Sequence, residues 1–358
     1  MSHSFDHGGN IFAVAQRLGI APSEITDFSA SINPLGLSPQ IKNAIIEALG
    51  SLIHYPDNNH CELKNALADY HHLSPTNLVI ANGSTELIYQ IPAMLQGRKA
   101  LIISPSFSEY LRALDQHGWE SHHFLLSPEN NFQLDLKSLE QTLCKGYDAL
   151  YLCNPANPGG TFYPLQVVEQ VYNLCKATGA FLVLDEAFVD FCEDGSAKHF
   201  IVNHENCIVL RSMTKFFGIP GLRLGYSISA ISLAERLDTR GVPWSVNTLA
   251  QVAGVAALND TEHNRRTIEY IQRERFFLSE KLSEFRQFKV YPSSTNFLLI
   301  EITDKMTSSE LKNRLLAYRI MIRDCSSFMG LSTYFFRIAV RTTEENKRLL
   351  AALANVVN

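Results

Sequence analysis

The chain has 358 residues, of which 46% are hydrophobic and 19% are charged, as is typical of a globular protein with a full core. This length exceeds one typical domain, so we expect a large domain with a smaller companion. A formal net charge of −5 argues against nucleic-acid binding, and no apolar run reaches the length of a membrane span.

The seven cysteines are scattered, odd in number and free of CxxC spacing. They predict buried thiols in a reducing cytoplasm rather than disulfides or a metal site. The polar start "MSHSFDHGGN" lacks the apolar core of a signal peptide, which also favours a cytoplasmic protein. The paired histidines, His71 with His72 and His122 with His123, show no metal-ligand spacing, and we expect them to be solvated.

Short apolar runs alternate with helical patterns through the middle of the chain. The runs at 99–105, 148–155, 180–188 and 206–213 indicate buried strands bounded by turn residues. Between them, the segment 163–179 has the pattern of a helix that ends at a glycine cap. This alternation predicts an α/β fold with a mostly parallel sheet covered by helices on both faces. We assign it to a large domain over 41–250, with ligands expected at the carboxyl ends of the strands.

The pattern changes toward the C-terminus, which we assign to a smaller α+β domain over 251–358. A long charged helix is predicted over 262–285, with further helices near 309–318 and from Thr343 onward. Strand-like apolar segments lie at 288–302, 320–326 and 334–341. Because few helices separate these strands, the pattern favours a partly antiparallel sheet.

The segment "NLVIANGSTELIYQ" runs from a short strand directly into a helix. Gly83, Ser84 and Thr85 lie at this junction, where free backbone amides and the helix dipole favour a phosphate group. The junction therefore predicts an anion site. An ordinary helix cap is the alternative when this motif is taken alone.

Other predicted strand ends carry polar residues whose chemistry belongs together. Asp185 ends the strand pattern in "FLVLDEAF", and Asn157 follows a strand in "NPANPGG". Ser212, Lys215 and Arg223 lie in "RSMTKFFGIPGLRLGY", where the apolar neighbours of Lys215 indicate a buried amine. Taken alone, Asp185 fits a helix cap equally well. Lys215 taken alone could be an ordinary surface amine.

Together, an anion cradle, a buried carboxylate, an amide and a buried lysine at neighbouring strand ends fit pyridoxal 5'-phosphate (PLP). The Lys215 amine would bind the aldehyde covalently, and the Asp185 carboxylate would keep the pyridine nitrogen protonated. Asn157 would donate to the phenolic oxygen, while Arg223 and Ser212 would complete the phosphate contacts. A competing interpretation, the Asp-bearing strand of a phosphate-loop NTPase, lacks the required GxxxxGK[ST] motif.

The order "NGSTE", "NPANPGG", "LDEAF", "RSMTKFFGIPGLRLGY" resembles the fold-type I PLP-dependent enzymes, most closely the histidinol-phosphate aminotransferase branch, over nearly the whole chain. The resemblance implies Lys215, Asp185 and Asn157 in the roles given above. It also implies that Tyr110, in "SFSEYLRA", stacks on the cofactor ring, with plain helix packing as the alternative. It further implies a homodimer in which Tyr55 reaches the cofactor phosphate of the neighbouring subunit.

Within that branch, "HGGNI", "DFSASINPLG", "YPD" and "PWSVN" resemble the threonine-phosphate decarboxylases. That family converts L-threonine O-3-phosphate to aminopropanol phosphate for the cobalamin nucleotide loop, and L-serine O-phosphate is a second substrate to consider. Phe188 stands three residues after Asp185, where many aminotransferases of this branch carry a tyrosine that bonds the phenolic oxygen. The alternatives are an aminotransferase acting on histidinol phosphate or an aromatic amino acid, and a non-catalytic cofactor-binding protein.

The resemblance also implies the contacts to a small phosphorylated amino acid. Arg323 and Arg337 would grip its phosphate and carboxylate, because guanidinium groups suit both, whereas Arg341 is expected at the surface. An N-terminal arm over 1–40, which joins the small domain, is implied to close over the substrate with His7, Gly8 and Asn33, and Asn157 is implied to contact the substrate as well. For His7, a disordered terminus is the alternative.

Overall fold

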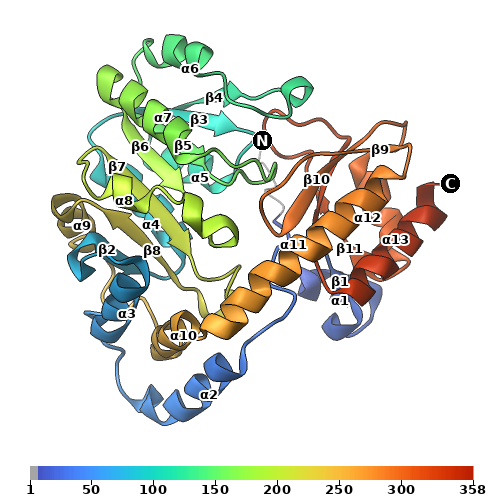
Figure 1. Ribbon diagram of the computed structural model, residues 1–358, viewed down its shortest axis with the longest axis horizontal. Helices are drawn as coiled ribbons and strands as arrows, with labels where there is room; N and C mark the ends of the chain where they lie inside the picture. The colour runs from blue at the N-terminus through green and yellow to red at the C-terminus, as the bar shows by residue number, and fades with distance from the viewer. Residues whose placement is uncertain (1–6, 358) are drawn as a thin grey trace.

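The computed structural model describes residues 7–357 and shows a large and a small β-sheet with helices packed around them (Figure 1). In the large sheet, β8 runs antiparallel to both neighbours, and the other strands run parallel to one another. In spatial order its strands are β2 (Leu78–Ala81), β8 (Gly225–Ser229), β7 (Cys207–Ser212), β6 (Phe181–Asp185), β5 (Ala149–Cys153), β3 (Lys99–Ser104) and β4 (Glu120–Leu125).

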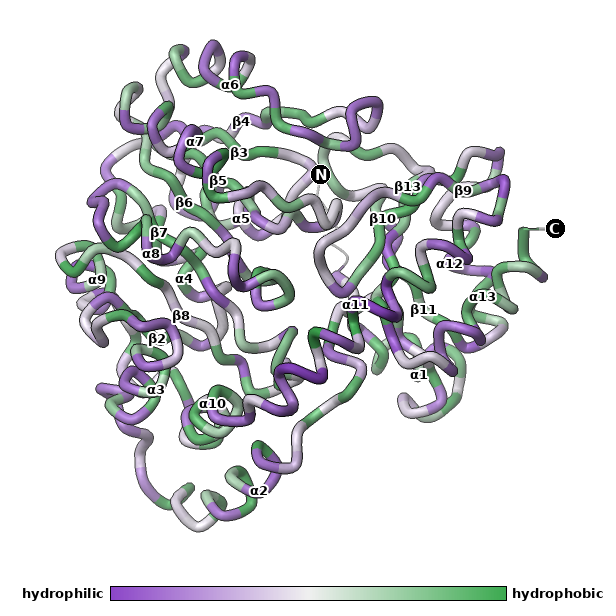
Figure 2. Tube along the Cα trace, viewed as in Figure 1, coloured by the Kyte–Doolittle hydropathy of each residue, from purple (hydrophilic) through white to green (hydrophobic). Residues whose placement is uncertain are grey.

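Both faces of the large sheet are buried. In β6, Leu182 and Leu184 face one helical layer, while Phe181 and Val183 face the other. Because each face is covered, the central strands are mainly hydrophobic, as Figure 2 shows, with polar residues only at their carboxyl ends in β6 and β7. The first layer includes α2 (Pro39–Ala48), α3 (Cys61–His71), α6 (Leu136–Leu143), α7 (Leu165–Thr178), α8 (Lys198–Ile201) and α10 (Thr248–Asn259), and the second includes α4 (Ser84–Met94), α5 (Glu109–Gln116) and α9 (Ile231–Asp238).

The small sheet is antiparallel and has its own hydrophobic core. Its strands, in spatial order, are β12 (Arg323–Asp324), β13 (Phe335–Ala339), β10 (Phe297–Ile302) and β9 (Phe288–Val290). The helices packed on it are α11 (Thr261–Ser283), α12 (Ser308–Leu316) and α13 (Thr343–Val357). In Figure 1, α11 runs from beside α10 to this sheet and so connects the two regions.

The N-terminal segment lies with the small sheet region. Its first helix, α1 (Ile11–Leu18), is followed by β1 (Thr26–Asp27), which pairs in parallel with β11 (Ile320–Met321). Ala15 and Ile25 from this segment form a small core with Leu316 and Met321. Pairing and packing together bring the segment from His7 onward next to β12.

The predicted α/β architecture is confirmed. The predicted strands of the large sheet correspond to β3, β5, β6 and β7, and the predicted glycine-capped helix is α7, where Gly179 has a φ of 77°. The later predicted helices correspond to α11, α12 and α13. Strands β4 and β8 lie where no strand is predicted. The sequence of β4 is polar because it forms the sheet edge, and its His122 and His123 are half-buried rather than solvated.

A buried group of charges holds the segment after β6 against β7. Arg211 in β7 has no exposed surface, and its guanidinium forms ion pairs with Asp190 at 2.9 Å and Glu193 at 2.5 Å. Glu186 lies 3.5 Å from the same guanidinium and also accepts a hydrogen bond from the Ala197 amide at 2.8 Å. These contacts join the segment that follows β6 to the end of β7. Removing one partner would leave a buried charge uncompensated, which would destabilise the fold.

His71 extends this cluster, which corrects the expectation that it is solvated. Its side chain is fully buried, and Nε2 lies 2.6 Å from the Tyr226 hydroxyl. Its Nδ1 lies 3.5 Å from Glu193 and 3.3 Å from the Lys198 amine. Burial outweighs the attraction of Glu193 and lowers the pKa of His71 to about 4. His71 is therefore neutral at neutral pH.

We expect His71→Gln to reduce the acid sensitivity of the fold. In the unfolded chain this histidine titrates near pH 6.5, whereas its folded pKa is about 4. Between these values the unfolded state binds the extra proton, so the free energy of unfolding decreases as the pH falls, by up to about 3 kcal/mol. Denaturant titrations of both proteins at pH 7, 5.5 and 4 measure this slope. An unchanged slope in the variant would contradict a buried neutral His71.

Candidate active site

A cavity of about 520 Å³ lies where the carboxyl ends of β5, β6 and β7 face the small sheet and the N-terminal segment. Side chains that are far apart in the sequence meet there, because parallel strands end at one edge of the sheet. The sequence-predicted residues in its lining are His7, Gly8, Ser84, Thr85, Tyr110, Asn157, Asp185, Lys215, Arg223, Arg323 and Arg337.

Lys215 follows β7, is half-buried, and presents its amine to the cavity. Its Nζ donates to Thr214 Oγ1 at 2.7 Å and to Ser212 Oγ at 3.3 Å, and it lies 5.6 Å from the centroid of the Phe188 ring. Burial lowers the pKa of this amine to about 8, although the Asp185 carboxylate opposes the shift. A far larger fraction of Lys215 than of an ordinary lysine is therefore unprotonated, and nucleophilic, near neutral pH.

Asp185 ends β6 and is held in a fixed orientation. Its Oδ2 accepts a hydrogen bond from the Tyr110 hydroxyl at 2.5 Å, and its Oδ1 accepts one from the Ala187 amide at 2.9 Å. Burial raises the pKa of the Asp185 carboxyl, while these hydrogen bonds and the charge of Lys215 oppose the shift. Each carboxylate oxygen can accept a second hydrogen bond, so Asp185 can also bind a protonated ring nitrogen.

The first turn of α4 forms an anion cradle at one end of the cavity. Ser84 and Thr85 line the cavity there together with Arg223. Gly83 has a φ of 78°, and a Cβ at this position would lie 2.6 Å from Arg223 Nη2. A Cβ on Gly225 would lie 2.2 Å from the Ser84 amide nitrogen. Two glycines thus let a guanidinium and β8 approach the helix N-terminus, where amides, hydroxyls and a cation suit a phosphate.

Two arginines of the small sheet form the opposite end of the cavity. Arg323 and Arg337 are direct cross-strand partners, so their side chains project from the same face. Both are buried; Arg337 donates to the Ser29 carbonyl at 3.1 Å and to Asn157 Oδ1, and Arg323 donates to Ser327 Oγ at 3.2 Å. Among the described residues, the buried Arg337 Nε has no hydrogen-bond partner. Two adjacent buried guanidinium groups suit a ligand with two anionic groups.

The N-terminal segment borders the cavity at His7 and Gly8. A Cβ on Gly8 would lie 2.2 Å from the Ser29 carbonyl oxygen, so only glycine allows this close approach. The Gly9 amide then donates to Ser29 Oγ at 2.8 Å. His7 Nε2 donates to Glu109 Oε1 at 2.9 Å. These contacts fix His7 and Gly8 next to the arginine pair.

Asn33 and Arg341 do not lie where they were expected. Asn33 is buried outside the cavity lining, where its side-chain amide donates to the Phe216 carbonyl at 2.8 Å. Its backbone amide donates to the Lys215 carbonyl at 3.0 Å, so Asn33 supports the lysine segment. Arg341 is half-buried rather than at the surface, because it donates to the Asp27 carbonyl at 3.1 Å.

Gly83, Ser212 and Tyr55 also lie outside the cavity lining. Gly83 packs behind Arg223, and Ser212 contacts the cavity through Lys215. Tyr55 is 81% exposed, and its ring centroid lies 4.8 Å from that of Trp244. In one copy of the chain, Tyr55 therefore contributes nothing to the cavity.

Sequence reasoning missed three residues that hold the site together. Thr214 bonds the Lys215 amine, Glu109 bonds His7, and Ser29 contacts Arg337 through its carbonyl. Thr214 directly precedes Lys215 in the sequence, so this adjacency was an available signal. Ser29 gave no such signal for its contact with Arg337, because a backbone carbonyl is common to all residue types.

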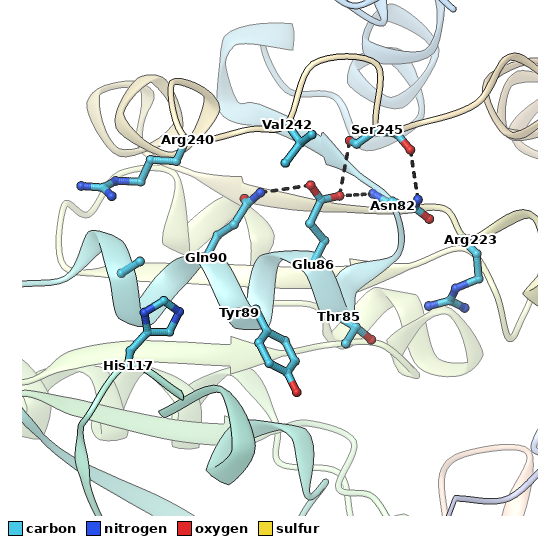
Figure 3. A pocket seen from close by; sticks show the side chains of 11 residues that line it. Asn82, Thr85, Glu86, Tyr89, Gln90, His117, Arg223, Arg240, Val242 and Ser245 are labelled. Atoms are coloured by element: carbon cyan, nitrogen blue, oxygen red, sulfur yellow. Dashed lines mark hydrogen bonds between the residues drawn. The ribbon is translucent and has the colours of Figure 1, made fainter. Parts of the chain in front are cut away.

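A second hollow of about 720 Å³ shares Thr85 and Arg223 with the cavity. Figure 3 shows the Glu86 carboxylate at its wall, between Gln90 and the turn before α4. Glu86 accepts hydrogen bonds from the Asn82 amide at 2.5 Å and from Gln90 Nε2 at 3.1 Å. These bonds fix the turn that carries the anion cradle.

Three structural features concern metal binding, membrane crossing and the state of the cysteines. Within residues 7–357, no group of three or more His, Cys, Asp and Glu side chains is arranged to hold a metal ion. Over the same range, no helix combines the length and the apolar character that crossing a bilayer requires. All seven cysteines are free thiols.

The two-sheet fold and this cavity define the class of protein. The family model described as "Aminotransferase class I and II" matches residues 23–353, which is most of the chain. The protein therefore belongs to the class I and II aminotransferase family, and the predicted fold-type I architecture is confirmed.

Individual relatives are similar along their whole length. The threonine-phosphate decarboxylase of Salmonella typhimurium is 39% identical, over 98% of this chain and 96% of that protein. The crystal structure of L-threonine-O-3-phosphate decarboxylase from Porphyromonas gingivalis is 28% identical with a TM-score of 0.81, covering 92% of this chain and 98% of that one. The histidinol-phosphate aminotransferase from Clostridium acetobutylicum is 30% identical with a TM-score of 0.86, at the same coverage.

We expect the Lys215 amine to react at lower pH than an exposed lysine. Its pKa of about 8 places the midpoint of modification by acetic anhydride near pH 8 in cofactor-free protein. Asp185→Asn should lower this midpoint, because the carboxylate stabilises the protonated amine. Peptide mass spectrometry, with the exposed Lys145 as internal reference, measures both. If Lys215 and Lys145 were modified with the same pH dependence, the amine would not be desolvated as the structure shows.

Proposed function

We propose that this protein is a PLP-dependent decarboxylase that converts L-threonine O-3-phosphate to aminopropanol phosphate and carbon dioxide, supplying the cobalamin nucleotide loop. One observation carries the proposal: the 39% identity, over 98% of the chain, to the threonine-phosphate decarboxylase of Salmonella typhimurium. The free state of all seven cysteines supports a reducing, cytoplasmic location.

The cavity fits PLP at its aldehyde, its ring nitrogen and its phosphate. Lys215 offers a nucleophilic amine for the aldehyde, and Asp185 offers a buried carboxylate for the ring nitrogen. Ser84, Thr85 and Arg223 form the cradle for the phosphate. When bound, PLP supplies an electron sink for the electrons of a bond broken at the substrate's Cα.

The arginine pair would orient the substrate. L-Threonine O-3-phosphate carries a carboxylate and a phosphate, and Arg323 and Arg337 are the paired buried cations that face this ligand space. By holding both anionic groups, they fix which bond at Cα is presented for cleavage. Lys215, with a pKa of about 8, is suited to carry the proton that Cα takes up after carbon dioxide leaves.

Phe188 favours decarboxylation over transamination. It is buried after β6, its ring packs edge-on against Phe297 at 5.0 Å, and it borders the cavity beside Lys215. A phenylalanine offers no hydroxyl where many aminotransferases of this branch have one. The TM-score of 0.86 to a histidinol-phosphate aminotransferase keeps transamination as the second function to test.

Product analysis tests the proposed reaction. Purified holoenzyme is incubated separately with L-threonine O-3-phosphate, with L-serine O-phosphate, and with L-histidinol phosphate plus 2-oxoglutarate, and the products are identified by mass spectrometry. We expect aminopropanol phosphate from the threonine compound and no glutamate from the last mixture. Glutamate formed without loss of carbon dioxide would replace this proposal with the aminotransferase.

We further propose that the enzyme works as a homodimer. Exposed apolar side chains lie near Tyr55 in the sequence and at its ring contact, Trp244. Large exposed apolar patches mark interfaces. The patch is formed by Ile46, Leu49, Leu52, Ile53, Tyr55, Val242 and Trp244. Val242 also lines the hollow that shares Arg223 with the cavity, so a second copy seated on the patch would lie beside the cofactor phosphate.

Ile53→Asp should dissociate the proposed dimer. Ile53 is 83% exposed and belongs to the patch, and a carboxylate there would have to be desolvated in the interface. Sedimentation velocity should show twice the chain mass for the wild type and the single chain mass for the variant. Phe276→Asp, at a residue 73% exposed on α11, is the matched control and should remain dimeric. A monomeric wild type would refute the dimer.

A further inference from the structure

We infer that Glu109 is a positioning residue whose carboxylate orients the imidazole of His7 and thereby sets the affinity for the phosphorylated substrate. This inference rests on the proposed function and deepens it. Glu109 is the first residue of α5, directly before Tyr110, and it is almost fully buried. Glu109 itself does not line the cavity, so it acts through His7, which does.

The Glu109 carboxylate is bonded on both of its oxygens. Oε1 accepts hydrogen bonds from His7 Nε2 at 2.9 Å and from Arg112 Nη1 at 3.0 Å. Oε2 accepts one from the Tyr89 hydroxyl at 2.7 Å. Because Tyr89 lies on α4 and Arg112 on α5, the carboxylate is anchored to two helices, and it offers His7 a rigid acceptor.

Glu109 is a charged acceptor under all ordinary conditions. Burial alone would raise the pKa of its carboxyl, but hydrogen bonds from His7, Tyr89 and Arg112 outweigh burial and lower this pKa to about 2. A carboxylate bonded to Nε2 keeps a proton on that nitrogen of His7. The other ring nitrogen, Nδ1, is then the atom that can meet a ligand, and in the imidazolium form it donates to a phosphate.

His7 is held on further sides by its neighbours. Its ring centroid lies 5.8 Å from that of Phe107, which also lines the cavity, and the next residue, Gly8, packs directly on Ser29. The Gly8 contact fixes the position of the His7 main chain, and Glu109 fixes the orientation of the His7 ring. Losing the carboxylate would therefore change the orientation of the ring while the Gly8 contact remains.

The test compares holoenzyme variants by calorimetric titration with aminopropanol phosphate, together with KM and kcat for L-threonine O-3-phosphate. Glu109→Gln should raise the dissociation constant and KM about tenfold, equivalent to about 1.4 kcal/mol, and leave kcat unchanged. His7→Ala should have a similar effect. In the His7→Ala background, Glu109→Gln should add nothing, because the two residues act as one unit.

Tyr89→Phe is the matched control, because it removes one anchor at Oε2 and leaves the Oε1 contact to His7; it should raise the dissociation constant much less than Glu109→Gln does. An effect of Glu109→Gln that persists in full without His7, or that falls on kcat, would overturn the inference. If the wild type binds aminopropanol phosphate and Glu109→Gln binds it equally well, the inference is overturned while the proposed function stands. A wild type that neither binds aminopropanol phosphate nor releases carbon dioxide would overturn the proposed function and this inference with it.

Discussion

The partial burial of the Lys215 amine beside the buried Asp185 carboxylate is the constraint on which the rest of the site depends. An amine removed from water loses its proton more readily, and a neighbouring carboxylate limits that shift, so the pKa settles at about 8. Neither group would keep its place without support. Tyr110 and Ala187 bond Asp185, Thr214 bonds Lys215, and the Arg211 cluster joins the strands that carry both.

The second requirement is that two regions of the chain meet at this pair. The large sheet brings the lysine, the aspartate and the anion cradle to one edge, as parallel strands do. The small sheet places Arg323 beside Arg337 at one end of the cavity, and the pairing of β1 with β11 keeps the N-terminal segment beside them. Reaction choice then depends on a few side chains whose positions are set by the junction between these regions.

Much of this arrangement could be predicted from sequence, because hydrophobic periodicity locates β3, β5, β6 and β7, and the residues just after buried parallel strands must share an edge. Lys215, Asp185, Asn157 and Arg223 therefore reach one cavity as expected. The rest depends on tertiary packing. Nothing local shows that β4 and β8 are strands, that Asn33 turns toward the Lys215 segment, or that His71 is buried in a charged cluster.

The central claim is that these side chains present the Cα–carboxylate bond for cleavage and leave the Cα–H bond intact. The most direct measurement uses L-threonine O-3-phosphate deuterated at Cα, with mass spectrometry of the amine formed in ordinary water. The account predicts aminopropanol phosphate that retains its deuterium and gains one solvent hydrogen at the same carbon. Loss of the deuterium to solvent would show that the Cα–H bond is the one broken, and would contradict the account.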